Sequence, residues 1–162
     1  MRILLNKLSS NGATALEFAL VFPIFALLIC GIMEFGWYFH VQHTIQFATR
    51  EGTRLALVGG QLEDKEGKLL NRADSIVKAI KDNAAGAVDT NNLNISIFPV
   101  GPGYTDPEEW NTMINAGTGG DYMRVRVLYT FTFNTPLIGN FFPSGAKIIH
   151  AEALYRNELF TG

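Results

Sequence analysis

A chain of 162 residues has room for one modest domain and a membrane anchor. Its net charge of -2 and its scattered basic residues exclude the basic patch on which nucleic-acid binding depends, and its single cysteine excludes an intrachain disulfide. Charged residues make up only 17% of the chain, and the apolar residues are concentrated between Ala13 and Phe39.

The chain begins with a short basic segment that leads into this long apolar run. Arg2 and Lys7 precede Ala13–Phe39, a stretch of about 27 residues that would measure roughly 40 Å as a helix. That length is enough to cross a hydrocarbon core of about 30 Å, and membrane helices tolerate an internal proline such as Pro23. The basic flank predicts a single-pass anchor with a cytoplasmic N-terminus and the rest of the chain outside.

A cleaved secretory signal fits the same segment less well. Such a signal has an apolar stretch of about 7–15 residues, followed by a cleavage site of small residues. The uncharged run from Phe18 to Met33 is at the upper edge of that length, and no Ala-x-Ala sequence follows it. A lipoprotein signal would use Cys30, but the bulky Ile29 directly precedes that cysteine.

One carboxylate, that of Glu17, lies inside the beginning of the apolar run. A carboxylate at mid-bilayer costs at least about 2.5–3.5 kcal/mol, so it needs a partner unless it lies in the wet interface. Cleavage after Gly12 would free an ammonium group on Ala13 and leave Glu17 as the fifth residue of the mature chain.

These residues resemble a known processing site. Gly12, followed by ATALEF, resembles a type IV prepilin site, and the longer stretch GATALEFALVFP resembles the TadE-like pseudopilins of tight-adherence (Flp) pilus systems. The resemblance continues at residues 31–36 and at Arg50–Arg54, where Thr53 replaces the usual alanine. It returns near the C-terminus at residues 120–127 and 156–158.

The resemblance implies that a prepilin peptidase cuts between Gly12 and Ala13, and that Glu17 and Phe18 act in processing and assembly. It also implies a bacterial inner-membrane protein with a periplasmic head. The implied partners are the prepilin peptidase, other pilins or pseudopilins, and the pilus assembly machinery.

In pilin-like proteins the glutamate at the position of Glu17 is thought to pair with the N-terminal amine of a neighbouring subunit. An amine and a carboxylate about 4 Å apart attract each other by on the order of 4 kcal/mol at an effective dielectric constant of 20, before desolvation. The alternative is pairing within the same chain, because the new amine of Ala13 would lie about 6 Å from Glu17 along the helix.

Helical periodicity continues beyond the membrane segment. Apolar or small residues recur at three- and four-residue steps up to a stop at Gly59-Gly60. They are Phe35, Tyr38, Val41, Ile45, Ala48, Gly52 and Leu55. On the polar side, Arg50, Glu51 and Arg54 form either a salt-bridged helix face or a docking surface for another pseudopilin. A second amphipathic helix is expected from about Glu63 to Ala85, ahead of Gly86.

The period then changes to two. Strands are expected at residues 93–97, at 123–133 and from about Lys147 to Arg156. The segment from Asn134 to Gly145 contains prolines and glycines and is expected to lack regular structure. Together these elements predict an α+β fold, in which a small antiparallel sheet carries the helices on one face.

No residue constellation for catalysis is found, and neither a metal nor a cofactor is predicted. His40 and His43 lie one turn apart without further ligands, and His150 stands alone on a strand. The loop from Gly101 to Gly120 carries acidic residues that lack the ordered spacing of a calcium loop, so a solvated surface loop is expected. Trp110 in that loop is either a partner anchor or a lid on the sheet.

The predicted organisation has four parts: a leader at residues 1–12, a transmembrane helix at 13–39, its amphipathic extension at 40–60, and a periplasmic head at 61–162. The predicted function is that of a minor pilin or pseudopilin in tight-adherence pilus assembly, and not that of an enzyme. The alternative is an unprocessed, membrane-tethered periplasmic binding or sensor domain.

Overall fold

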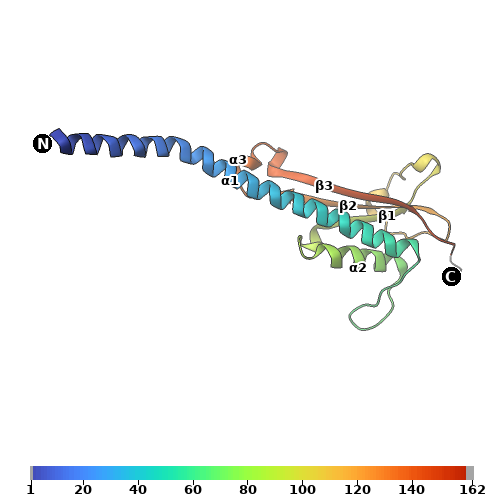
Figure 1. Ribbon diagram of the computed structural model, residues 1–162. Helices are drawn as coiled ribbons and strands as arrows, with labels where there is room; N and C mark the ends of the chain where they lie inside the picture. The colour runs from blue at the N-terminus through green and yellow to red at the C-terminus, as the bar shows by residue number, and fades with distance from the viewer. Residues whose placement is uncertain (1, 160–162) are drawn as a thin grey trace.

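A computed structural model describes the backbone of residues 2–159 and the side chains of residues 12–159. Within this range the helices are α1 (Arg2–Leu57), α2 (Arg72–Ala84) and α3 (Pro136–Gly139), and the strands are β1 (Leu93–Pro99), β2 (Tyr122–Thr132) and β3 (Ala146–Arg156). The strands form one antiparallel sheet in the order β1-β2-β3. The predicted α+β fold is confirmed (Figure 1).

The long helix α1 has an isolated half and a packed half. Its N-terminal part extends away from the sheet as a single rod, and its side chains from Gly12 to Phe25 are all exposed (Figure 1). Pro23 lies within the helix without ending it. This part of α1 is long and apolar enough to cross a membrane, and its most apolar stretch is not buried in the molecule. An exposed apolar helix of this length is typical of a single-pass membrane protein.

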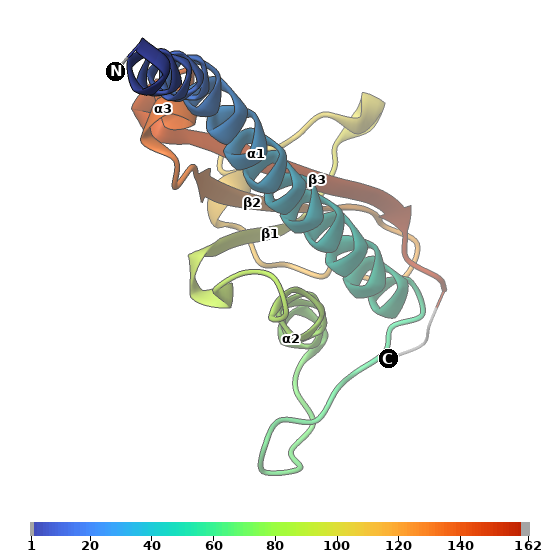
Figure 2. The same cartoon turned by 60° about the vertical axis from the view of Figure 1, so that its left-hand side comes forward.

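The packed half of α1 lies with α2 on one face of the sheet (Figure 2). The buried stripe of α1 follows the predicted three- and four-residue steps from Val41 to Gly52, because those positions share one side of a helix. At the ends of the predicted stripe, Phe35 is exposed, and Ala56 is buried in place of Leu55. The core combines this stripe with side chains from α2 and from the inner face of the sheet. Its largest fully buried members on these elements are Ile45, Ile76, Ile80, Ile97, Met123 and Ile149.

The predicted end of α1 at Gly59-Gly60 is confirmed, and its geometry explains the two glycines. Gly59 adopts φ +70°, and its N–H donates to the carbonyl of Ala56 over 3.1 Å. The N–H of Gly60 donates to the carbonyl of Leu55, also over 3.1 Å. This pair of bonds is a Schellman cap, which requires a left-handed residue after the helix and therefore favours glycine.

The predicted start of the second helix at Glu63 is wrong. Glu63 instead forms an isolated bridge with Leu69 around a turn in which Gly67 has φ +78°. The helix starts only after Asn71, whose side chain accepts a hydrogen bond from the N–H of Asp74. This N-cap satisfies one of the helix's free N–H groups and fixes the start of α2.

The expectation that Asn134–Gly145 lacks regular structure is also wrong. Pro136 begins α3, and Pro143 begins a 3₁₀ turn at Pro143–Gly145. Proline is well suited to the first helical position, since its missing N–H would have no partner inside the helix and its φ is already helical.

Candidate functional site

The residues of the predicted processing site lie together near the end of the exposed rod. Gly12, Ala13 and Glu17 are exposed on α1, within about one and a half turns of each other along the helix. Phe18 is also exposed, and its ring stacks on that of Phe22 with centroids 5.1 Å apart. No part of the described head covers this segment, so it is accessible to an enzyme or to other subunits.

Glu34 is the one acidic side chain of α1 that the head buries. It is only 8% exposed, although it lies within the predicted transmembrane stretch. Its two carboxylate oxygens accept hydrogen bonds from the backbone N–H groups of Asn134 and Thr135, over 2.5 and 2.8 Å. Because Thr135 is the N-cap of α3, this carboxylate fastens the long helix to the start of the α3 segment.

Gly52, in the middle of the Arg50–Arg54 block, is where α1 and α2 approach each other most tightly among the glycines of α1. A Cβ atom at this position would lie 2.4 Å from Cγ1 of Ile80 and 3.3 Å from the backbone oxygen of Ile76. Only a glycine allows this approach without displacing α2.

The charged residues of the same block lie in two different hollows. Glu51 and Arg54 form an ion pair of 3.0 Å and line a groove of about 420 Å³ between α1 and α2. Arg50 lines a second hollow, of about 280 Å³, with His150 and Glu152 of β3. The Glu51–Arg54 pair agrees with a salt-bridged helix face.

A second junction joins α1 to the C-terminal end of β3. The guanidinium group of Arg72 donates to the carbonyls of Ala56 and Gly117 and to the side chain of Asn157. Asn157 is buried, and its amide group donates to the carbonyls of Ala116 and Thr118. These contacts bring together the end of α1, the start of α2 and the segment after β3.

The sequence blocks near the C-terminus are neighbours in the fold. Tyr122 of the first block pairs with Arg156 of the second block in the sheet register. The N–H of Asn157 donates to the carbonyl of Asp121 over 2.9 Å, and Gly120 returns a bond to the carbonyl of Asn157. Both blocks therefore belong to one structural junction rather than to separate sites.

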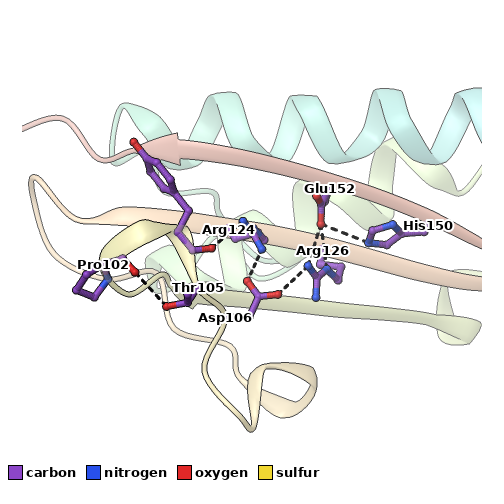
Figure 3. A network of polar contacts seen from close by, with 8 residues as sticks. Pro102, Thr105, Asp106, Arg124, Arg126, His150 and Glu152 are labelled. Carbon is purple, nitrogen blue, oxygen red and sulfur yellow. Dashed lines mark hydrogen bonds and ion pairs between the residues drawn. The ribbon is translucent and has the colours of Figure 1, made fainter.

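The outer face of the sheet, opposite the helices, carries a network of charges (Figure 3). Asp106, from the loop after β1, is ion-paired with Arg124 and Arg126 of β2. Arg126 also contacts Glu152 over 2.9 Å, and Glu152 lies 3.4 Å from His150.

The contacts of Trp110 with this network distinguish between a partner anchor and a lid on the sheet. The guanidinium carbon of Arg126 lies 4.2 Å from the centre of the Trp110 ring, and that ring lies against Phe98 of β1, with centroids 5.9 Å apart. Trp110 is therefore a lid on the sheet, and Phe98 is fully buried beneath it. Most residues of the loop are exposed, as expected of a surface loop, but Asp106 and Trp110 also hold it against the sheet.

Among the side chains that the structure describes, no group of three histidine, cysteine, aspartate or glutamate residues could hold a metal ion. His40 and His43 are both exposed on α1, and the ring of His40 lies 5.2 Å from that of Trp37. The carboxylate of Asp106 is ion-paired with two arginines.

Two of the contacts that position these segments were missed by sequence reasoning. The sequence predicts neither a partner for Glu34 nor the contact between Arg72 and Asn157. A signal for Glu34 was present, since an acidic residue inside an apolar run needs a partner. The identity of that partner, 100 residues further along the chain, had no local signal.

The comparisons with known proteins bear on the N-terminal part of the chain. Neither the search of curated proteins nor the search of solved structures gave a match. The model of one protein family, described as TadE-like protein, matches residues 12–54. This match spans the exposed rod, Glu34 and the Arg50–Arg54 block, so this part of the chain is similar to the TadE-like family, as the sequence resemblance predicts.

Proposed function

We propose that the chain is a minor pilin or pseudopilin that acts at the bacterial inner membrane in assembly of a tight-adherence (Flp-type) pilus. In this proposal a prepilin peptidase removes residues 1–12, residues 13–39 cross the membrane, residues 40–60 extend the helix, and residues 61–162 form the periplasmic head. The observation that carries the proposal is the TadE-like match over residues 12–54, which begins at the expected scissile glycine.

The shape of the molecule supports this role. An exposed apolar helix that continues into a small α+β head can be held in a membrane and later packed against other helices. No catalytic machinery is needed for such a role. The work is done by packing and by the pairing of charges at the end of the helix.

The local sequence at Gly12 is suited to cleavage. A peptidase must unwind the helix at the bond that it cuts, and glycine costs a helix about 1 kcal/mol relative to alanine. Ser9, Ser10 and Asn11, which are also weak helix formers, precede Gly12. Cleavage on the cytoplasmic face is therefore easiest at this point of α1.

Glu17 is proposed to receive the new amine of Ala13 from a neighbouring subunit during assembly. Its carboxylate is exposed on a rod that the head does not cover, so an adjacent helix can reach it. Arg50, Glu51 and Arg54 are proposed to contact other subunits further along the same helix, since they lie on the exposed sides of α1 beside α2 and β3.

The experiment that tests this proposal replaces Glu17 by alanine in cells that make the pilus. Membrane insertion should be unchanged, because the apolar run does not need the carboxylate, whereas pilus formation should fall strongly. The variant would lose a Coulombic attraction on the order of 4 kcal/mol, before desolvation, between Glu17 and the amine of a neighbouring subunit. The readouts are membrane fractionation and counting of pili by electron microscopy.

A matched control removes an exposed carboxylate from the head instead, by Glu66→Ala. This variant should assemble pili normally. Normal piliation of Glu17→Ala would contradict the assembly role of Glu17.

A further inference from the structure

The α3 segment, residues 134–145, forms the end of the head nearest to the N-terminal half of α1 (Figure 1). It contains no charged residue. Two of its large apolar side chains point away from the core: Leu137 is 51% exposed and Phe141 is 79% exposed. Exposed apolar side chains that lie together at one end of a small domain are typical of a surface that contacts another protein or a membrane.

The α3 segment is fixed against α1 at a defined level. Glu34 holds the N–H groups of Asn134 and Thr135, and the side chain of Ile138 lies 4.0 Å from the Cβ position of Gly31. On its other side, Phe142 stacks on Phe133 with centroids 4.2 Å apart. The segment therefore sits beside residues 31–35 of α1.

That level lies near the outer end of the proposed membrane span, which runs from Ala13 to Phe39. If hydrocarbon covers residues 13–33, which measure roughly 31 Å, then the α3 segment lies at the hydrocarbon boundary. If it covers residues 18–38, then the segment lies within the outer leaflet. In either position the exposed side chains of Leu137 and Phe141 belong to a segment at or inside the hydrocarbon boundary.

The aromatic residues of α1 mark the same level. Phe35, Trp37 and Phe39 are exposed just after Glu34. Aromatic side chains at this position of a membrane helix are typical of the interface between lipid headgroups and hydrocarbon.

Most of the backbone N–H groups of the α3 segment have partners, which suits an apolar medium, where an unpaired N–H group is costly. Two of them donate to Glu34 and five donate within the segment, and two of its residues are prolines without an N–H group. The internal bonds run from Gly139 to Thr135, Asn140 to Pro136, Phe141 to Ile138, Phe142 to Gly139, and Gly145 to Phe142.

The geometry points to a second membrane contact: the α3 segment inserts Leu137 and Phe141 into the outer leaflet beside α1, so that the head rests on the lipid surface. This inference rests on the membrane anchor of the proposed function. It goes beyond that function, because it assigns a lipid-binding surface to the head itself and fixes the head's orientation.

The test uses the full chain, reconstituted at one copy per nanodisc of phosphatidylethanolamine and phosphatidylglycerol. In a Cys30→Ser background, which removes the single cysteine, the variant Phe141→Cys carries an environment-sensitive fluorophore. Its emission should shift to the blue and should be quenched by lipids that carry a nitroxide near the headgroup. Leu137→Cys should give the same result. Agreement between the two positions would show that the result does not come from a local perturbation by one label.

A matched control places the fluorophore at Phe47→Cys, another exposed phenylalanine, about 18 Å further along α1 than Phe35. Emission at this site should be that of a fluorophore in water, without quenching. Labelling of the native Cys30 reports on the anchor separately, because that side chain is exposed inside the proposed span.

The outcomes separate the two claims. Quenching at Cys30 without quenching at positions 137 and 141 would overturn the inference and leave the anchor intact. Absence of quenching at Cys30 would overturn the anchor itself. A blue shift at position 141 that occurs only when several copies share a nanodisc would show that a second copy covers the segment, and this also overturns the lipid contact.

Discussion

At the residue scale, the stability of the fold depends on a few positions where a single atom or group affects the packing of the core. Gly52 is the clearest, because its missing side chain lets α1 and α2 touch. Tyr155 is a second example: its ring is buried, and among the described residues its hydroxyl group has no hydrogen-bond partner.

Replacing Gly52 by alanine should lower the free energy of unfolding by about 1–3 kcal/mol, because the new methyl group would overlap Ile80. Gly36→Ala is the matched control on the same helix, since a Cβ there has nothing within 4 Å. Thermal unfolding in detergent should show a lower midpoint for the first variant only.

A double variant, Gly52→Ala with Ile80→Ala, provides a further check. It should be more stable than the sum of the two single effects predicts, because Ile80→Ala removes the atoms that the new methyl group meets. Additive losses would contradict the close approach.

Tyr155 predicts a specific response to alkaline pH. Burial raises the pKa of Tyr155 to about 12, and the charge of Arg72 lowers it by a smaller amount. The folded-state pKa exceeds the unfolded value near 10. The contribution of Tyr155 to the free energy of unfolding is therefore fully present below about pH 10, and it is lost as the pH rises toward 12. The loss is on the order of 2–3 kcal/mol.

Tyr155→Phe should therefore lose less stability than the wild type between pH 9 and pH 11, measured by urea unfolding at each pH. At pH 7 the variant should be at least as stable as the wild type, since it removes a buried hydroxyl group whose hydrogen bond is not satisfied. Parallel pH profiles for the two proteins would contradict this role of Tyr155.

At the element scale, local patterns predicted the elements that depend on local physics. The strands were expected near their true positions because alternating apolar residues report which side of a strand is buried. The end of α1 was expected from two glycines that can form its cap.

The elements that were misplaced depend on signals weaker than periodicity. The apolar stripe alone suggested a helix from Glu63, whereas the N-cap of Asn71 and Asp74 sets the start of α2. Pro136 was read as a breaker, although at a first helical position it favours a helix. The contacts of Glu34 and Arg72 join distant segments, which one sequence does not reveal.

The loop from Gly101 to Gly120 gives a prediction at this scale. Asp106→Asn should weaken the contacts of the loop with Arg124 and Arg126, and it should leave two positive charges poorly balanced on the sheet. Because these groups are partly exposed, the loss of global stability should be modest, about 1 kcal/mol. Limited proteolysis should nevertheless cut the loop faster than in the wild type.

Glu108→Gln is the control for this experiment. It removes an acidic group from the same loop, but its side chain is exposed and holds no ion pair among the described residues. Equal cleavage rates for the two variants would show that Asp106 does not pin the loop.

At the scale of the whole molecule, one helix joins two environments. Its N-terminal half is apolar and exposed, and its C-terminal half provides one wall of the head core. Glu34 lies where the two halves meet and is held by the head. This arrangement fits a protein whose anchor is prepared by processing and whose head meets other subunits outside the membrane.

The central claim of the proposed function is that a prepilin peptidase cleaves the chain between Gly12 and Ala13. Intact-mass spectrometry of the chain purified from cells with an active prepilin peptidase tests it most directly, with cells that lack the peptidase as the control. The account predicts a mature chain that begins at Ala13 in the first case and an uncut chain in the second. A chain that keeps residues 1–12 despite the active peptidase would contradict the account and favour an unprocessed, tethered domain.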